Sequence, residues 1–118
     1  MRLSVLLIEP DLSTLDIMAD MVTALGHRAI GVLTTAMAIG ALQAIKVDVA
    51  IIGLAPDDPD GIAIAALAKS HQPGIKTVVS SGKHVSRIAM PTIDAFLNKP
   101  FSIDDMRKTL QALYPGDR

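Results

Sequence analysis

The stretch VDVAIIGLAPDDPDG, residues 47–61, decides the fold of this chain. Its first six residues are an apolar run of strand length, which is typical of a strand covered on both faces. The residues rich in Pro, Asp and Gly that follow predict a loop at the carboxyl end of that strand. Gly53 stands at the strand end, so a position where α/β domains often place a reactive group has no side chain.

Strands and helices alternate on either side of this stretch. Further strands are predicted over residues 2–8, 27–32, 75–81 and 93–97. Helices are predicted over residues 12–25, 35–45, 61–71, 82–90 and 102–114, the last with a capping-box start at Ser102 and Asp105. Because strands joined by helices lie parallel, we expect a flavodoxin-like, doubly wound (βα)5 α/β fold with a five-stranded parallel sheet.

The amino-acid composition excludes several classes of function. The chain has 118 residues, a net charge of −1, 3% aromatic residues and no cysteine. These values predict one domain over residues 1–118, no nucleic-acid platform, and no disulfide or thiol chemistry. No apolar run reaches membrane-spanning length and no signal peptide is apparent, so we expect a cytoplasmic protein without membrane contact. The last predicted helix ends at residue 114, so no output domain is expected.

Polar residues follow the predicted strands where a doubly wound sheet places its site, at the carboxyl ends. They are Glu9-Pro10-Asp11, Gly53, Ser80-Ser81 and Lys99-Pro100. Five segments, spread over the whole length of the chain, carry a resemblance to a known family. They are IEPDLST, LGH, DVAIIG…DDPDG, VVSSG and FLNKPF. In them the chain resembles the receiver domains of two-component response regulators, and NKPF is the most specific of the five.

The resemblance implies a set of site residues. Receivers bind Mg²⁺ through an acidic pair after the first strand and a phosphate-accepting aspartate at the end of the third. A Ser or Thr after the fourth strand and a Lys before a cis-Pro after the fifth hold the phosphoryl oxygens. By this resemblance the chain keeps Ser81, Lys99, Pro100 and, as second member of the acidic pair, Asp11.

The departures from the family pattern are at the centre of the site. Pro10 takes the place of the first acid, Gly53 that of the acceptor aspartate, and Phe96 the switch aromatic position, without a hydroxyl. Glycine has no oxygen with which to attack phosphorus. With two carboxylates gone, only Asp11 and Glu9 remain for a metal, so no cofactor is expected and Mg²⁺ would bind weakly at most.

Other readings of these residues stay open or are rejected. We expect Lys99 to form an ion pair with Asp11, whereas Ser81 is equally suited to an anion or to a nearby backbone group. The loop aspartates Asp57, Asp58 and Asp60 could replace the acceptor only by folding back over the strand. The DDPDG segment does not fit an EF-hand, SSGKH does not fit a phosphate-binding loop, and the three histidines lack metal-ligand spacing.

Two features point to protein contacts. Met37 and Ile39 lie on a helix whose apolar residues face several directions, which favours a partner patch there. The segment between Ser81 and Lys99 is about one helical turn shorter than the family usually has, so the usual partner surface of receivers is expected to be altered.

The sequence therefore predicts a stand-alone degenerate receiver, not an enzyme, acting through protein–protein contacts without accepting phosphate. The expected partners are a histidine kinase, a phosphotransfer protein or another receiver, with the chain a monomer or a homodimer. One alternative is a receiver phosphorylated on another carboxylate. The other is a module that binds a small anion or ligand at Ser81 and Lys99.

Overall fold

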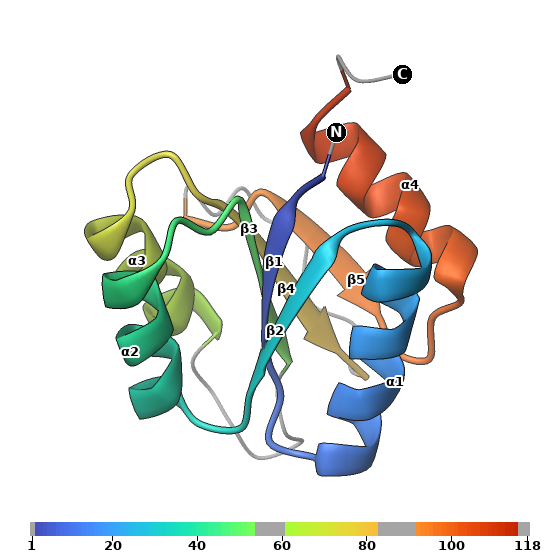
Figure 1. Cartoon of the computed structure of the whole chain (residues 1–118), viewed down its shortest axis with the longest axis horizontal. Coiled ribbons are helices and arrows are strands. Elements are labelled where there is room, and N and C mark those ends of the chain that lie inside the picture. Colours follow the sequence, from blue (N-terminus) through green and yellow to red (C-terminus); the bar gives the residue numbers. More distant parts are fainter. Residues whose placement is uncertain (1, 54–60, 83–91, 116–118) are drawn as a thin grey trace.

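The computed structural model describes residues 2–53, 61–82 and 92–115. These residues form one sheet with helices on both of its faces (Figure 1). The strands are β1 (Ser4–Ile8), β2 (Arg28–Val32), β3 (Val49–Gly53), β4 (Lys76–Ser81) and β5 (Ala95–Asn98). The helices are α1 (Leu12–Ala24), α2 (Thr35–Ala44), α3 (Gly61–His71) and α4 (Ile103–Leu113).

The sheet has the strand order β2-β1-β3-β4-β5, and every neighbouring pair is parallel. The chain adds β2 on one side of β1 and then continues with β3 on the other side. The order therefore reverses between β1 and β3, which makes their carboxyl ends the switch point of the fold. The predicted doubly wound, five-stranded parallel sheet is confirmed.

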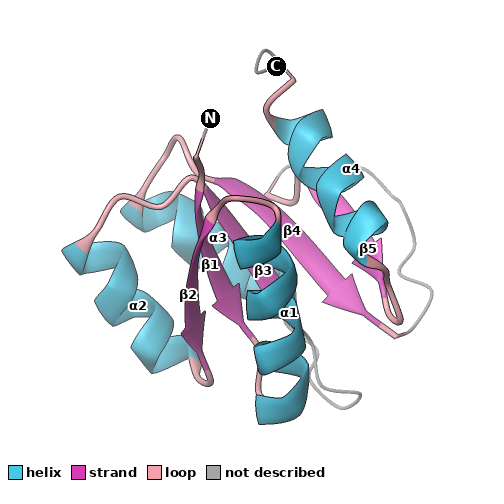
Figure 2. Cartoon of the chain, turned by 45° about the vertical axis from the view of Figure 1, so that its right-hand side comes forward, coloured by secondary structure: helices cyan, strands magenta, loops and turns pink. Residues whose placement is uncertain are grey.

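Two apolar layers hold the helices to the sheet. Helices α1 and α4 cover one face and α2 and α3 the other (Figures 1 and 2). Successive strand residues point to opposite faces, so Leu7 and Ile51 pack under α1 and α4 while Ile8 and Ile52 pack under α2 and α3. The positions of these side chains fix which residues at the strand ends share a face.

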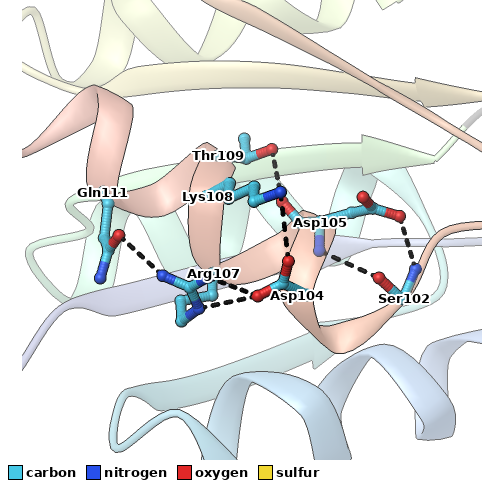
Figure 3. Close-up of polar contacts among 7 residues, drawn as sticks. All are labelled: Ser102, Asp104, Asp105, Arg107, Lys108, Thr109 and Gln111. Carbon is cyan, nitrogen blue, oxygen red and sulfur yellow. Dashed lines mark hydrogen bonds and ion pairs between the residues drawn. The ribbon is translucent and has the colours of Figure 1, made fainter.

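The helix ends explain several polar residues. Asp11 is the N-cap of α1, and Gly26 follows that helix with a φ of 87°, a conformation that favours glycine. Ser102 and Asp105 form the predicted capping box of α4, in which each side chain accepts a hydrogen bond from the backbone N–H of the other (Figure 3).

Some sequence expectations fall outside the described residues. The helix expected over residues 82–90 lies there except for Gly82, and so do the loop residues Asp57, Asp58 and Asp60. In the described part of the chain, no helix has the length and apolar character that crossing a membrane requires.

Asp94 ties the start of β5 to its neighbours. Its Oδ2 accepts hydrogen bonds from the N–H of Thr77, at 2.8 Å, and from the ammonium of Lys69, at 2.9 Å. Burial would raise the pKa of Asp94, but the Thr77 N–H and the Lys69 charge outweigh it, so this pKa lies below its ordinary value of 3.8. The carboxylate form of Asp94 therefore stabilises the fold.

Acid should remove this contribution of Asp94. Because its folded-state pKa is depressed, the stabilisation is present above the unfolded pKa and is lost as the pH falls through the folded pKa. In urea unfolding between about pH 6 and about pH 3, Asp94→Asn should lose less stability than the wild type. Asp20→Asn, at an exposed position of α1, should follow the wild type. If the unfolding free energy of Asp94→Asn fell with pH as steeply as that of the wild type, this account would be contradicted.

Candidate functional site

Glu9 is the buried acid at the switch point. It directly follows β1, where its backbone N–H extends the ladder to the carbonyl of Val32 at 3.1 Å. The residue is 1% exposed. Both carboxylate oxygens are engaged, since Oε1 accepts from Lys99 Nζ at 2.7 Å and Oε2 from the N–H of Asp11 at 3.0 Å. A buried carboxylate is stable when it is paired and hydrogen-bonded in this way.

Gly53 lies against this carboxylate. A Cβ at position 53 would overlap Oε1 of Glu9 and would lie 2.9 Å from its Cδ and 3.1 Å from the carbonyl oxygen of Ile8. The side chain of Glu9 therefore occupies the space into which any side chain at position 53 would project. The absence of a side chain at the end of β3 is what leaves room for a carboxylate supplied from the end of β1.

Lys99 and Pro100 follow β5 at the same edge of the sheet. The peptide bond between them is cis, as the resemblance implied. The backbone N–H of Lys99 donates to the carbonyl of Ser81 at 3.0 Å, and its side chain is 24% exposed. The ion pair expected between Lys99 and Asp11 is wrong, because Lys99 pairs with Glu9.

Asp11 points away from this pair toward its own helix. Its Oδ2 accepts from the hydroxyl of Thr14 at 2.6 Å and from the Thr14 N–H at 3.0 Å. These two hydrogen bonds, together with the nearby charge of Lys99, lower the pKa of the exposed Asp11 carboxyl. Aspartate is among the preferred N-cap residues, so local helix capping accounts for Asp11. Pro10, beside it, is exposed.

Two serines end β4. Ser81 is largely buried, pairs with Asn98 in register, and accepts the Lys99 N–H through its carbonyl. Ser80 pairs with Gly53 in register, so the two lie on the same face of the sheet. The hydroxyl of Ser80 is buried and has no hydrogen-bond partner within the described part of the chain. An unsatisfied buried hydroxyl costs about 1–3 kcal/mol, so Ser80, to which the sequence analysis gave a place at the strand end but no role, is an exception.

The described side chains at this edge of the sheet do not fit the Mg²⁺ site that the resemblance implies. Mg²⁺ requires an octahedral shell of oxygen ligands. Glu9 is committed to Lys99, Asp11 caps α1, and Pro10 and Gly53 have no side-chain oxygen. Among residues 2–53, 61–82 and 92–115, no cluster of three or more His, Cys, Asp or Glu side chains could hold a metal ion.

The remaining predicted residues lie away from this pocket. Phe96 is partly buried on β5, opposite Val79 of β4. On α2, Met37 is 52% exposed and Ile39 is partly buried.

A groove of about 420 Å³ runs beside the pocket between α1 and the segment after β5. It is lined by Thr14, Ile17, Met18, Met21, Lys99, Pro100 and Phe101.

Sequence reasoning gave Glu9 only a minor part in the site. The signal that could have found it is the alternation of β1, because Val5 and Leu7 face the α1 and α4 layer and Glu9 continues that series. Residues 49, 51 and 53 of β3 form the matching series. The register that brings Glu9 beside Gly53 could not be obtained from the sequence, because it depends on strand pairing across the sheet.

The doubly wound sheet, with its strand order β2-β1-β3-β4-β5, matches a known class of domain. Solved structures show that the chain has the fold of CheY-like response regulator receiver domains.

A receiver domain from Methylobacillus flagellatus matches with a TM-score of 0.84 and 22% identity, over 96% of this chain and 99% of that one. A two-component response regulator from Clostridium difficile matches with a TM-score of 0.85 and 16% identity, over 98% of each chain. TrrA from Thermotoga maritima, solved in complex with Mg(2+)-BeF, matches with a TM-score of 0.82 and 13% identity, over 96% of this chain and 99% of that one.

At these identities the likeness concerns the fold alone. No family model matches the chain, and a search of curated proteins finds no match either.

Proposed function

We propose that this chain is a degenerate receiver domain of two-component or phosphorelay signalling, which acts through protein–protein contacts and not as an enzyme. It accepts no phosphate at the usual position. One observation carries the proposal: at the end of β3, where receivers place the acceptor, the space beside Gly53 holds the carboxylate of Glu9 in an ion pair with Lys99.

Phosphoryl transfer requires a nucleophilic oxygen that can approach phosphorus in line. Gly53 offers none. Glu9 has two oxygens, but its side chain is 2% exposed and both oxygens accept hydrogen bonds. To attack a donor, Glu9 would have to leave Lys99 and expose itself, which leaves a buried charge poorly compensated during the step. The pocket is therefore unsuited to acceptor chemistry.

Treatment with acetyl phosphate and Mg²⁺, followed by intact mass measurement, tests this proposal. We expect no added phosphoryl mass, because the pocket lacks both an accessible nucleophile and the oxygen ligands that Mg²⁺ requires. A receiver that carries the acceptor aspartate, treated in parallel, is the positive control. A phosphoryl mass on this chain would overturn the proposal. Peptide mapping would then tell whether Glu9 or a loop residue such as Asp57, Asp58 or Asp60 carries it.

The partners we propose are a histidine kinase, a phosphotransfer protein or another receiver. Exposed apolar side chains occur on both helix layers, and these are candidates for the contact surface. Met37 and Ile62 lie on α2 and α3, Leu12, Ile17 and Ile103 lie on α1 and α4, and Leu33 lies between β2 and α2. Ile39, expected to share the patch with Met37, is the less exposed of the two.

A module that binds an external anion through Ser81 and Lys99 is the less favoured alternative. The ammonium of Lys99 already has a buried anionic partner, so an external anion would have to displace Glu9. Thermal unfolding with phosphate, nucleotides or Mg²⁺ discriminates between the two functions, because a ligand that binds the native state raises the Tm.

A further inference from the structure

We propose that the space in front of Gly53 is a carboxylate-binding site and that the chain's own Glu9 is its resident ligand. This inference rests on the proposed function, because it takes the pocket to be the one in which receivers place their acceptor. It adds the chemical class of ligand that the pocket selects, and it explains why an acceptor at the end of β3 is dispensable for the fold.

Three groups from three elements define the site. Lys99, after β5, supplies the positive charge at 2.7 Å from one carboxylate oxygen. The N–H of Asp11, at the start of α1, donates to the other oxygen at 3.0 Å. Gly53, at the end of β3, supplies the space, because a Cβ there would overlap the carboxylate. A charge-assisted bond combined with a backbone donor is a strong arrangement for holding an anion.

A fourth group lies at the wall of the same space. Ser80 is opposite Gly53 in register, and its buried hydroxyl has no hydrogen-bond partner among the described residues. Most buried hydroxyls in proteins have a hydrogen-bond partner, so the unpaired hydroxyl of Ser80 beside the anion pocket needs an explanation. It indicates that the pocket has one more hydrogen-bonding group than the carboxylate of Glu9 engages.

Tethering determines how the native pocket responds to its surroundings. The carboxylate of Glu9 reaches the site from the adjacent strand, so its effective concentration there is far above that of any dissolved anion. A phosphate or phosphodonor must first break the pair between Glu9 and Lys99. We therefore expect Glu9 to remain in the native pocket when a phosphodonor is added.

Removal of the ligand gives a direct test. Glu9→Ala deletes a CH₂–COO⁻ group, which has the same heavy atoms as acetate. Acetate at about 0.5 M should raise the Tm of Glu9→Ala by about 5 °C more than sodium chloride at equal ionic strength. The wild type and Glu9→Gln, whose pockets remain filled, should show no such excess. Glu9→Ala with Lys99→Met should also show none, because the cation of the site is gone.

If Glu9→Ala does not fold, the double variant Glu9→Ala with Gly53→Asp tests the same inference. It returns a carboxylate to the pocket from β3, so it should fold and show a cooperative thermal transition, which Glu9→Ala alone would then lack. The inference is overturned if this double variant also fails to fold, or, where Glu9→Ala folds, if acetate has the same effect with and without Lys99. A phosphoryl mass on the wild type would instead sink the proposed function, so the two failures are distinguishable.

Discussion

Gly53→Ala should destabilise the domain by about 3 kcal/mol, the upper part of the range for overpacking a filled interior. The added Cβ would overlap Oε1 of Glu9 and come within 3.1 Å of the carbonyl oxygen of Ile8. A flexible side chain could normally rotate away from a methyl group. Here rotation would separate Glu9 from Lys99 and leave the carboxylate buried without its partner. Urea unfolding measures the loss.

The matched control is the same substitution on α2. Around Gly40 nothing lies within 4 Å of the built Cβ, and the residue is inside a helix. Gly40→Ala should therefore stabilise the domain by about 0.5–1 kcal/mol, because alanine has the higher helix propensity. Two identical substitutions with effects of opposite sign would show that the space at position 53, and not a general property of glycine, decides the result.

A double-mutant cycle then assigns the clash to Glu9. In the background of Glu9→Ala, adding Gly53→Ala should cost less than about 1 kcal/mol, since the two nearest atoms that the methyl group meets belong to Glu9 and only the carbonyl oxygen of Ile8, at 3.1 Å, remains of the three. If Gly53→Ala costs the same with and without Glu9, the two residues do not share a space and our description of the pocket is incorrect.

The sequence was sufficient for the fold because several local signals agreed. The apolar runs gave all five strands, and the structure begins and ends them within two residues of the predicted bounds. The Ser102 and Asp105 spacing gave the start of α4. Alternation of strands and helices permits few connections, and right-handed crossovers leave a parallel doubly wound sheet as the consistent arrangement.

The site was less accessible from the sequence. Its residues were expected at the right edge of the sheet, but Glu9 and Asp11 were given the wrong roles with respect to Lys99. Two acids separated by one residue look equivalent in a sequence, yet the first continues the inward series of β1 and the second caps a helix. The choice between them follows from strand register and side-chain direction, which are properties of the folded sheet.

Both proposals treat the pocket as a fixed structural element held by the ion pair between Glu9 and Lys99. Substitution of Lys99 tests them most directly. Lys99→Met keeps most of the aliphatic length and removes the charge. Among the described residues, the N–H of Asp11 is then the one remaining donor to the buried carboxylate of Glu9. Breaking a buried ion pair by removing one partner costs about 3–5 kcal/mol. Because Lys99 is 24% exposed, water compensates in part, and we expect the lower end of this range.

Lys108→Met provides the comparison for Lys99→Met. Lys108 pairs with Asp104 at 3.2 Å on the surface of α4, with side chains 68% and 53% exposed (Figure 3). Its loss should change stability by less than about 0.5 kcal/mol, since exposed helix pairs contribute little. Adding Glu9→Gln to Lys99→Met should recover stability, because no charge is then left buried. Equal effects of the two Lys→Met substitutions, or no recovery with Glu9→Gln, would mean that the Glu9–Lys99 pair does not hold the pocket together.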